Sequence, residues 1–240
     1  MIKVGLLGDS VGRGVVQENN NGKYVVSQQS FANLCQEKFD ILVENFSRFG
    51  STIMNGMTSF NRFFNELKTT NYVLMIFGGN DCNFDWDAIS QNPTLPHQPA
   101  CPVEEFKQKY TDLIHQVQAQ GESPVLLSLP PIAAHKFYHF ICRNRNAENI
   151  LQYLGGNINN INNWHEMYNL AVFYVGAHQG IPVLDITSPF FALKDYETYF
   201  CEDGMHPNEL GHKLIAETLQ NRLEKAFNSI DAWKRTVEIK

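Results

Sequence analysis

Five residues of this sequence have the chemistry of an acyl-transfer site. They supply a hydroxyl, a backbone N–H in a turn, an amide, a carboxylate and an imidazole: Ser10, Gly50, Asn80, Asp203 and His206. A serine hydroxyl is a weak nucleophile until a base removes its proton, and a histidine can be that base. Backbone N–H groups and an amide can stabilise the negative charge that develops on a carbonyl oxygen. The set predicts attack of a hydroxyl on a carbonyl carbon.

Ser10 lies in a glycine-rich turn directly after the first apolar run, residues 2–7. Glycine permits the tight turn that would expose its hydroxyl. The turn has neither the Gly-Lys-Ser/Thr of a phosphate-binding loop nor the glycine spacing of the dinucleotide fingerprint. Residues 8–12 fit the Gly-x-Ser-x-Gly pattern of α/β-hydrolases, but several strands precede the motif in those enzymes and only one run precedes it here.

Asp203 and His206 are three residues apart on a turn that Pro207 stiffens. At this spacing the carboxylate can reach one imidazole nitrogen, fix the tautomer and stabilise the imidazolium formed in the reaction. Gly50 and Asn80 have a plainer alternative as ordinary turn residues. Asp81, beside Asn80, is expected to hold its loop by accepting backbone hydrogen bonds.

The other histidines and the cysteines are expected to have no catalytic role. His135, His139 and Cys142 resemble metal-ligand spacing, but no carboxylate completes the set. Five histidines are interpreted as surface or helix-capping residues: His97, His115, His165, His178 and His212. The cysteines are odd in number and lack a CxxC pair, which indicates free thiols, although Cys82 and Cys101 could be bridged in an exported protein.

The spacing of apolar residues predicts an α/β fold. Strands are expected near 2–7, 41–46, 72–77, 124–129 and 181–186, and amphipathic helices over 30–39, 103–120, 165–179 and 207–227. In the last helix Pro207 suits the first turn. Its expected buried face is Leu210, Leu214, Ile215, Leu219 and Leu223. Buried strands that alternate with helices are typical of a parallel sheet covered on both faces.

One domain, 1–240, is expected, with insertions at about 82–101 and 130–163. The first is proline-rich and is predicted to be a loop rather than an element. Both follow strand ends, where the ligand crevice of a parallel sheet usually lies, so each is interpreted as a lid or as a neutral surface insertion. The second holds aromatic and basic residues: Lys136, Phe137, Tyr138, Phe140, Arg143, Arg145, Tyr153 and Trp164. These would suit a sugar ring, an acyl chain or an anionic leaving group, or would form a small core of their own.

The bulk properties exclude several classes of partner. A net charge of -6 argues against a nucleic acid or an anionic membrane. No apolar stretch approaches the ~20 residues that a membrane-spanning helix needs. No basic segment with an apolar core and a cleavage site begins the chain, so a cytoplasmic location is expected. The oligomeric state stays open, as does whether residues 230–240 pack on the domain or on a partner subunit.

Four blocks in order resemble the SGNH (GDSL-type) hydrolases, a family of esterases and lipases: 8–10, 45–52, 78–81 and 203–207. The resemblance implies a flavodoxin-like three-layer α/β/α sandwich, with a five-stranded parallel sheet in the order 2-1-3-4-5. It implies Ser10 as nucleophile, His206 as base and Asp203 as its orienting partner. The oxyanion donors would be the N–H groups of Ser10 and Gly50 and the side chain of Asn80. No metal and no organic cofactor is implied.

These residues and the resemblance together predict a serine hydrolase. It would cleave carboxylic esters of a small-molecule, glycan or lipid substrate through an acyl-enzyme. Short-acyl or O-acetyl esters are favoured because no long apolar groove is evident in the sequence. One alternative is a hydrolase of longer chains, of the lysophospholipase or thioesterase type. Another is a non-catalytic binding module on the same fold.

Overall fold

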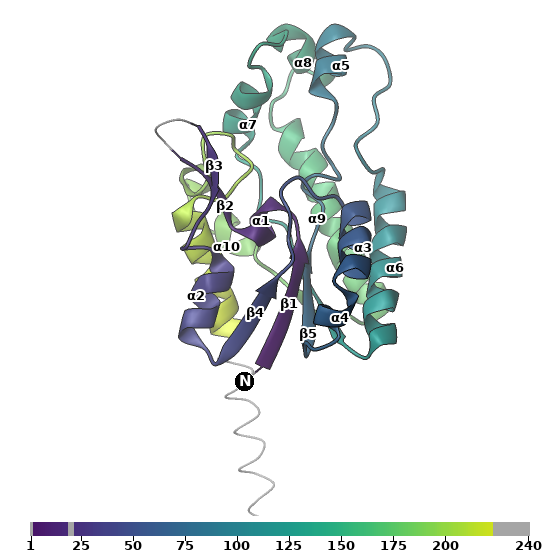
Figure 1. The fold of residues 1–240 in the computed structure, drawn as a ribbon. Coiled ribbons are helices and arrows are strands. Elements are labelled where there is room, and N and C mark those ends of the chain that lie inside the picture. Colours follow the sequence, from purple (N-terminus) through teal and green to yellow (C-terminus); the bar gives the residue numbers. More distant parts are fainter. Residues whose placement is uncertain (1, 19–21, 223–240) are drawn as a thin grey trace, which may run out of the picture.

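A parallel sheet lies at the centre of the computed structural model, which describes residues 2–18 and 22–222 (Figure 1). Its strands are β1 (Ile2–Gly8), β4 (Ile41–Asn45), β5 (Tyr72–Ile76), β6 (Ser123–Leu127) and β7 (Val183–Leu184). Their order is β4-β1-β5-β6-β7, and every neighbouring pair is parallel. Because β4 is the second apolar run, this is the expected order 2-1-3-4-5, and the flavodoxin-like α/β fold is confirmed.

The central strands are buried because apolar side chains cover both of their faces. Leu7 of β1 and Met75 of β5 have no exposed surface. A strand buried on both faces has a continuous apolar sequence, which is why these strands could be predicted. The edge strand β7 is shorter than the expected run 181–186, since only Val183–Leu184 pairs with β6.

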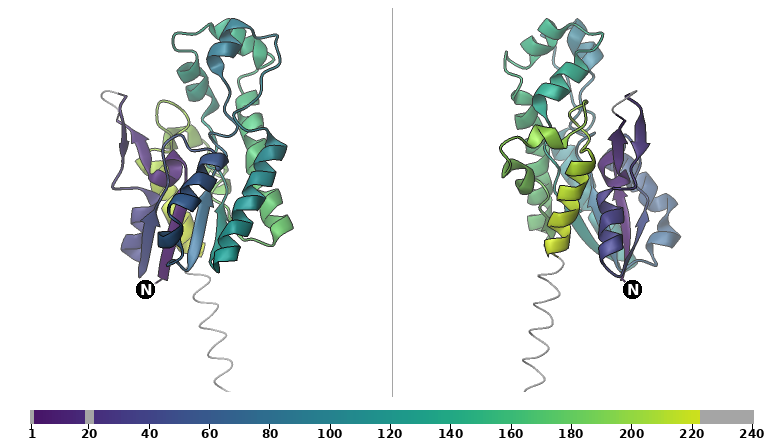
Figure 2. Two further views of the ribbon diagram at one scale, coloured as in Figure 1. Left: turned by 45° about the vertical axis from the view of Figure 1, so that its right-hand side comes forward. Right: turned by 90° about the vertical axis from the view of Figure 1, so that its left-hand side faces the viewer.

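Helices form a layer on each face of the sheet (Figures 1 and 2). One layer holds α2 (Phe31–Lys38) and the helical residues 209–222, and the other holds α3 (Ile53–Arg62), α6 (Val103–Gln120) and α9 (Asn160–Gln179). Three further short elements are α4 (Phe64–Leu67), which follows α3, and α10 (Ser188–Phe191) and η1 (Tyr196–Tyr199), which follow β7 in the sequence. Within the described part of the chain, none of the helices has the length and apolar character needed to cross a membrane.

The helix α6 has the bounds that the sequence predicts. It begins after Pro102 and ends at Gly121, whose backbone is left-handed with a φ of 98°. Glycine adopts this conformation without strain and so ends helices readily. The predicted stripe is fully buried against the sheet and α9: Phe106, Tyr110, Leu113, Ile114 and Val117. A periodicity of 3.6 residues is sufficient to predict the buried face of α6, because one face of this helix packs on the protein and the other is exposed to solvent.

The last helix differs from its prediction at its start. It begins at residue 209, and Pro207 instead forms a β-bridge with Phe200. Asn208 caps the helix, since its Oδ1 accepts a hydrogen bond from the Gly211 N–H at 3.1 Å. Pro207 therefore precedes the helix rather than occupying its first turn.

The buried face of this helix is also shifted from the predicted one. Leu210 is 56% exposed, whereas Ile215 and Leu219 are buried as expected. His212 has no exposed surface and occupies the inward position in the first turn. Leu210 is two residues away, on the opposite side of the helix. Leu223 and residues 230–240 lie outside the described residues.

Both insertions contain helices, so the prediction of a loop over 82–101 was wrong. That segment holds α5 (Trp86–Gln91), and residues 130–163 hold α7 (Ala134–Ile141), α8 (Ala147–Tyr153) and the first turn of α9. The prolines of the first insertion lie after α5, where they do not interrupt it. Asp85 caps α5 by accepting a hydrogen bond from the Ala88 N–H at 3.0 Å. We call α5, α7 and α8 the cap; they stand together beyond the carboxyl end of the sheet (Figure 1).

The cap has a hydrophobic core of its own, separate from the core around the sheet. Its buried members are Trp86, Ile89, Ile132, Ala134, Phe137, Ile141, Ile150, Leu154 and Ile161. Arg145 of the second insertion donates two hydrogen bonds to Asp87 of the first, at 2.7 and 2.8 Å. The two insertions, far apart in the sequence, therefore form one unit. The aromatic residues of 130–163 do form a small core, which was one of the two alternatives.

A β-hairpin that the sequence did not indicate lies beside the cap. It consists of β2 (Val15–Gln17) and β3 (Tyr24–Val26), which pair antiparallel. The Gln17 N–H donates to the Cys201 sulfur at 3.3 Å, which ties the hairpin to the turn before the last helix. Strands of three residues have too short an alternating pattern to be recognised in a sequence.

All five cysteines have free thiols, as the sequence predicted. Cys82 and Cys101 are both buried, and burial raises the pKa of the Cys101 thiol to about 11. Thiols held in this way are protonated at neutral pH and pack as small apolar side chains.

Candidate active site

Ser10 is the first residue of α1 (Ser10–Arg13), immediately beyond the end of β1. Asp9 caps this short helix, because its Oδ1 accepts a hydrogen bond from the Val11 N–H at 2.9 Å. A side chain at Gly12 would place its Cβ 2.7 Å from the Ser47 hydroxyl, so the close approach of α1 to this loop requires glycine. The turn holds the Ser10 hydroxyl at the carboxyl edge of the sheet, with 6% of the residue exposed.

The structure brings Ser10, His206 and Asp203 into one hydrogen-bonded chain. His206 Nε2 lies 2.9 Å from Ser10 Oγ, and His206 Nδ1 lies 2.6 Å from Asp203 Oδ2. A carboxylate that accepts the Nδ1 proton leaves Nε2 unprotonated and able to accept the proton of the hydroxyl. All three residues are more than 90% buried, so water does not compete for these contacts.

Asp203 is held ionised by four donors. Its Oδ1 accepts the N–H groups of Met205 and His206 at 2.9 and 3.0 Å, and its Oδ2 accepts the Tyr24 hydroxyl at 2.9 Å as well as His206 Nδ1. Burial by itself would raise the pKa of Asp203. The hydrogen bond and charge of His206, together with the two backbone donors, outweigh burial and hold this pKa below its usual range.

Two aromatic rings enclose the imidazole of His206. Phe49 is stacked against it with the ring centroids 5.7 Å apart and an interplanar angle of 14°, and the Tyr24 centroid is 5.1 Å away. Tyr24 comes from β3 and is 179 residues from Asp203 in the sequence. No motif marks either residue, and the hairpin that carries Tyr24 was not predicted, so sequence analysis missed both.

Gly50 and Asn80 line the same cavity as Ser10 and His206, a pocket of about 130 Å³. Among the described residues, the backbone N–H groups of Ser10 and Gly50 have no hydrogen-bond partner. Gly50 has a φ of 71°, a left-handed conformation that any other residue would adopt only with strain. The Asn80 amide donates one hydrogen to the Ser51 carbonyl at 3.1 Å and has a second hydrogen free to donate.

The sequence of residues 4–219 matches the family of GDSL-like lipases and acylhydrolases. The chain belongs to this family. No curated protein sequence matches it significantly. The resemblance seen in the four sequence blocks is thus confirmed for nine tenths of the chain, and the protein is a member of a family of hydrolases.

Solved structures share the fold of this GDSL-like protein at low sequence identity. A lipase/acylhydrolase from Enterococcus faecalis is 18% identical with a TM-score of 0.68, over 94% of this chain and 97% of the other. A mutant of an acetyl-xylooligosaccharide esterase from Geobacillus is 13% identical with a TM-score of 0.65, over 92% and 93%. A psychrotrophic esterase from Pseudoalteromonas is 15% identical with a TM-score of 0.60, over 95% and 100%. The similarity shows the shared α/β sandwich.

Two further carboxyl groups of the GDSL-like domain are buried next to site residues in the sequence: Asp9 precedes Ser10, and Asp81 follows Asn80. Asp81 has no exposed surface, and its Oδ1 accepts the Ile53 N–H at 2.9 Å, so it anchors the start of α3 to its loop as predicted. Burial raises the pKa of Asp81 to about 7 and that of Asp9 to about 6, more than their hydrogen bonds lower it. Both carboxyl groups therefore hold a proton at mildly acidic pH.

His165 and His212 are buried, so their interpretation as surface or capping residues was wrong. His165 lines the catalytic pocket; its Nδ1 has no hydrogen-bond partner and lies 3.7 Å from Glu166 Oε1. His212 is stacked on Phe31 with the centroids 6.0 Å apart, and burial lowers its pKa to about 4. A helix pattern in which histidine is counted as polar assigns such residues to the surface.

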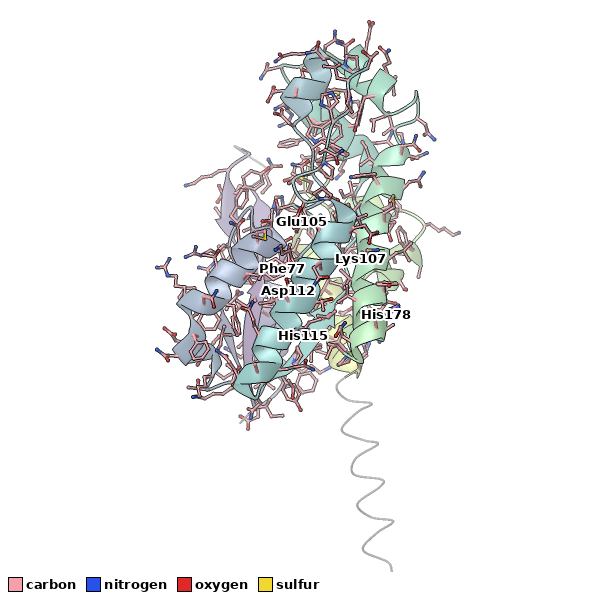
Figure 3. The ribbon with its side chains drawn as sticks, turned by 90° about the vertical axis from the view of Figure 1, so that its right-hand side faces the viewer. Phe77, Glu105, Lys107, Asp112, His115 and His178 are labelled. Atoms are coloured by element: carbon pink, nitrogen blue, oxygen red, sulfur yellow. The ribbon has the colours of Figure 1, made fainter. Side chains whose placement is uncertain are left out.

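The remaining histidines lie at or near the surface. Figure 3 shows His115 on α6 and His178 on α9, and both are exposed. His97 is half-buried, with Nε2 2.8 Å from the Asn92 carbonyl oxygen. His135 and His139 are exposed on α7. Within 2–18 and 22–222, no three histidine, cysteine or acidic residues are placed to hold a metal ion.

A second cavity, of about 320 Å³, adjoins the catalytic pocket. The two share five lining residues: Gly79, Asn83, Ile132, His165 and Met205. The rest of its wall comes from the cap, from the segments next to α5 and α8, and from α9. It includes five aromatic side chains: Phe84, Trp86, Phe137, Tyr153 and Trp164. The aromatic residues of the second insertion thus line a cavity next to Ser10 and also pack in the core of the cap.

Proposed function

We propose that this protein is a serine hydrolase that cleaves carboxylic esters through an acyl-enzyme. The observation that carries the proposal is the hydrogen-bonded chain from Ser10 Oγ through His206 to Asp203, with separations of 2.9 and 2.6 Å. Membership of the GDSL-like family supports the same class of reaction. Ser10 would be the nucleophile, His206 the general base and acid, and Asp203 the residue that orients the imidazole.

In the first half of the reaction, Ser10 Oγ attacks the carbonyl carbon while its proton passes to His206 Nε2. The carbonyl oxygen becomes an oxyanion, for which the donors are the N–H groups of Ser10 and Gly50 and the Asn80 side chain. The two N–H groups have no partner among the described residues, so the oxyanion displaces no protein hydrogen bond from them. In other hydrolases the loss of one such donor lowers turnover by about 10²–10³.

The second half regenerates the enzyme. When the tetrahedral intermediate collapses, the bond from the carbonyl carbon to the alcohol oxygen breaks, and His206 gives its proton to the departing alcohol. A water molecule then attacks the acyl-Ser10 ester while His206 accepts one of its protons. Collapse of this second intermediate releases the carboxylic acid and returns the proton to Ser10. Throughout, Asp203 stays ionised, in keeping with its lowered pKa.

The preference for short acyl groups that the sequence predicted loses its basis in the structure. Short acyl groups were favoured because no apolar groove was evident, and the aromatic cavity beside Ser10 removes that reason. A non-catalytic binding module remains the alternative to an enzyme. It is disfavoured by the geometry of the triad, since a module without catalysis has no need of a neutral Nε2 facing a serine hydroxyl.

The proposal predicts that Ser10→Ala lowers the turnover of p-nitrophenyl esters by about 10⁴–10⁶, because the attacking oxygen is lost. Ser59→Ala is the matched control, since Ser59 is also buried but lies in α3 and does not line the catalytic pocket. Rates are measured on an ester series from acetate to palmitate, with circular dichroism to show that both variants fold. A fluorophosphonate probe should label the wild-type protein and leave Ser10→Ala unlabelled. Equal hydrolysis by wild type and Ser10→Ala would rule the assignment out.

A further inference from the structure

The cavity of about 320 Å³ continues from the catalytic pocket into the cap. Ile132, His165 and Met205 lie at the junction, because they line both spaces. An ester bound with its carbonyl carbon at Ser10 has a direct path for one of its substituents through this junction. The cavity is therefore a subsite of the same site rather than a separate one.

Three polar side chains of the cavity wall already donate hydrogen bonds within the protein. The Trp86 indole N–H donates to Asn83 Oδ1 at 2.8 Å, and the Trp164 indole N–H donates to the Cys82 carbonyl at 2.9 Å. Asn160 Nδ2 donates to the Leu154 carbonyl at 2.9 Å. The hydroxyl groups of a sugar ring could not accept hydrogen bonds from these three N–H groups, and each hydroxyl left unpaired would cost binding free energy.

Most of the remaining surface of the wall is apolar. The aromatic rings of the wall pack edge-to-face on one another; Phe84 contacts Trp86 with centroids 5.7 Å apart and Tyr153 at 5.6 Å. His165 Nδ1 has no hydrogen-bond partner among the described residues and lies 3.7 Å from Glu166 Oε1 on the same helix. A mostly apolar wall favours a guest that gains contact area and needs few hydrogen bonds.

We propose that this cavity binds the acyl chain of a medium-chain ester. A methylene group takes roughly the 30 Å³ of a liquid water molecule, so the cavity has room for a chain of about eight to ten carbons. The proposal rests on the hydrolase function proposed above and adds the substrate class. It also gives the two insertions a joint role, since neither alone encloses the space.

The first test is kcat/KM on p-nitrophenyl esters from acetate to palmitate. Each methylene that leaves water for the cavity should raise kcat/KM by about fourfold, as expected for burial of one methylene group. The rise should end near eight to ten carbons, because a chain of that length fills the cavity of about 320 Å³ and further methylene groups stay outside it. A kcat/KM that is highest for acetate and falls with each added carbon would overturn the proposal.

Two substitutions on α9 test whether the preference for longer acyl chains arises in this cavity. Ile161→Trp fills the cavity that Ile161 lines and should lower the ratio of octanoate to acetate hydrolysis at least tenfold. Leu170→Trp introduces the same side chain on the same helix, where Leu170 is 65% exposed, and should not change the ratio. The ratio is independent of the active fraction of each preparation. An unchanged ratio in a folded Ile161→Trp protein would contradict the proposal.

Hydrolysis of octyl acetate tests whether the cavity binds the acyl chain or the alcohol chain of the ester. If the cavity holds the acyl chain, kcat/KM should be higher for p-nitrophenyl octanoate than for p-nitrophenyl acetate. The kcat/KM of octyl acetate should then be only slightly higher than that of ethyl acetate. If kcat/KM rises from ethyl acetate to octyl acetate but not from p-nitrophenyl acetate to p-nitrophenyl octanoate, the cavity holds the alcohol chain and the acyl assignment is wrong.

Calorimetry with octanoate and Ser10→Ala separates this proposal from the proposed function. Octanoate should bind to the variant at least tenfold more tightly than acetate, and Ile161→Trp in the same background should abolish the difference. Octanoate binding without any ester hydrolysis by the wild type would support the cavity and refute the hydrolase. Acetate hydrolysis without tighter octanoate binding would support the hydrolase and refute the cavity.

Discussion

At the scale of single residues, Tyr24 extends the proposed triad by one member. Its hydroxyl donates to the same Asp203 oxygen that accepts the His206 Nδ1 proton. Burial and the neighbouring Asp203 raise the pKa of Tyr24 above its usual range, so the hydroxyl is always a donor. A donor on this oxygen fixes the position of the carboxylate and draws part of its negative charge away from the imidazole. We therefore assign Tyr24 a positioning role.

Tyr24→Phe should lower kcat/KM for a p-nitrophenyl ester about tenfold, within the range for a lost hydrogen bond to a charged group. The loss should fall on kcat and leave KM unchanged, because the Tyr24 hydroxyl acts on Asp203 and Tyr24 does not line the catalytic pocket. Tyr174→Phe is the control, because Tyr174 is 50% exposed on α9. A raised KM with an unchanged kcat would show that Tyr24 serves only packing.

At the scale of elements, α7 of the cap supports the turn that carries Asp203 and His206. The Ala133 N–H donates to the Gly204 carbonyl at 2.9 Å, and Lys136 Nζ donates to the Phe200 carbonyl at 3.0 Å. Gly204 has a φ of 72°, and a Cβ there would lie 2.4 Å from the Phe137 nitrogen. Glycine is thus required twice over, by its conformation and by the approach of α7.

Gly204→Ala should lower the free energy of unfolding by about 3 kcal/mol, since left-handed strain of about 1–2 kcal/mol adds to a backbone clash. Gly156→Ala is the matched control: Gly156 has a φ of 78° and nothing within 4 Å of its Cβ, so only the strain applies. Urea unfolding measures both variants. Ester hydrolysis should fall in the first variant alone. Equal destabilisation by the two substitutions would show that α7 can move aside at no cost.

At the scale of the whole molecule, buried titratable groups couple stability to pH. Asp81 has a pKa of about 7 in the folded state against an ordinary value of 3.8. The folded protein therefore keeps a proton that the unfolded chain loses, and the free energy of unfolding falls as pH rises from about 4 through 7. Buried His212, with a pKa of about 4, has the opposite effect and removes stability as pH falls below about 6.5.

Comparison of wild type with Asp81→Asn isolates the contribution of Asp81. Asparagine has nearly the same shape, can accept the Ile53 N–H and does not ionise. The stability of the variant relative to the wild type should increase between pH 5 and pH 8.5, by on the order of 2–4 kcal/mol. Thermal or urea unfolding at both pH values gives this difference. A difference that is the same at both pH values would mean that Asp81 is not protonated at pH 5 in the folded protein.

The sequence by itself determined the sheet and the identity of the candidate site residues. Continuous apolar runs predicted where the strands lie, because central parallel strands are buried on both faces. The order of the strands was implied by the resemblance to the SGNH hydrolases. Ser10, Gly50, Asn80, Asp203 and His206 could be named because each lies in a short block whose residue types suit its chemistry. Their roles stay a proposal that the variants above test.

Only the tertiary structure decided which distant segments meet. The contact from Tyr24 to Asp203 spans 179 residues, and the two insertions join into one cap through the pairing of Arg145 with Asp87. Short strands and short helices depend on such contacts more than on local propensity, so the hairpin and the cap are too short for a periodic pattern to be recognised. His165 and His212 were misplaced for the same reason, because burial is a property of what packs around a residue.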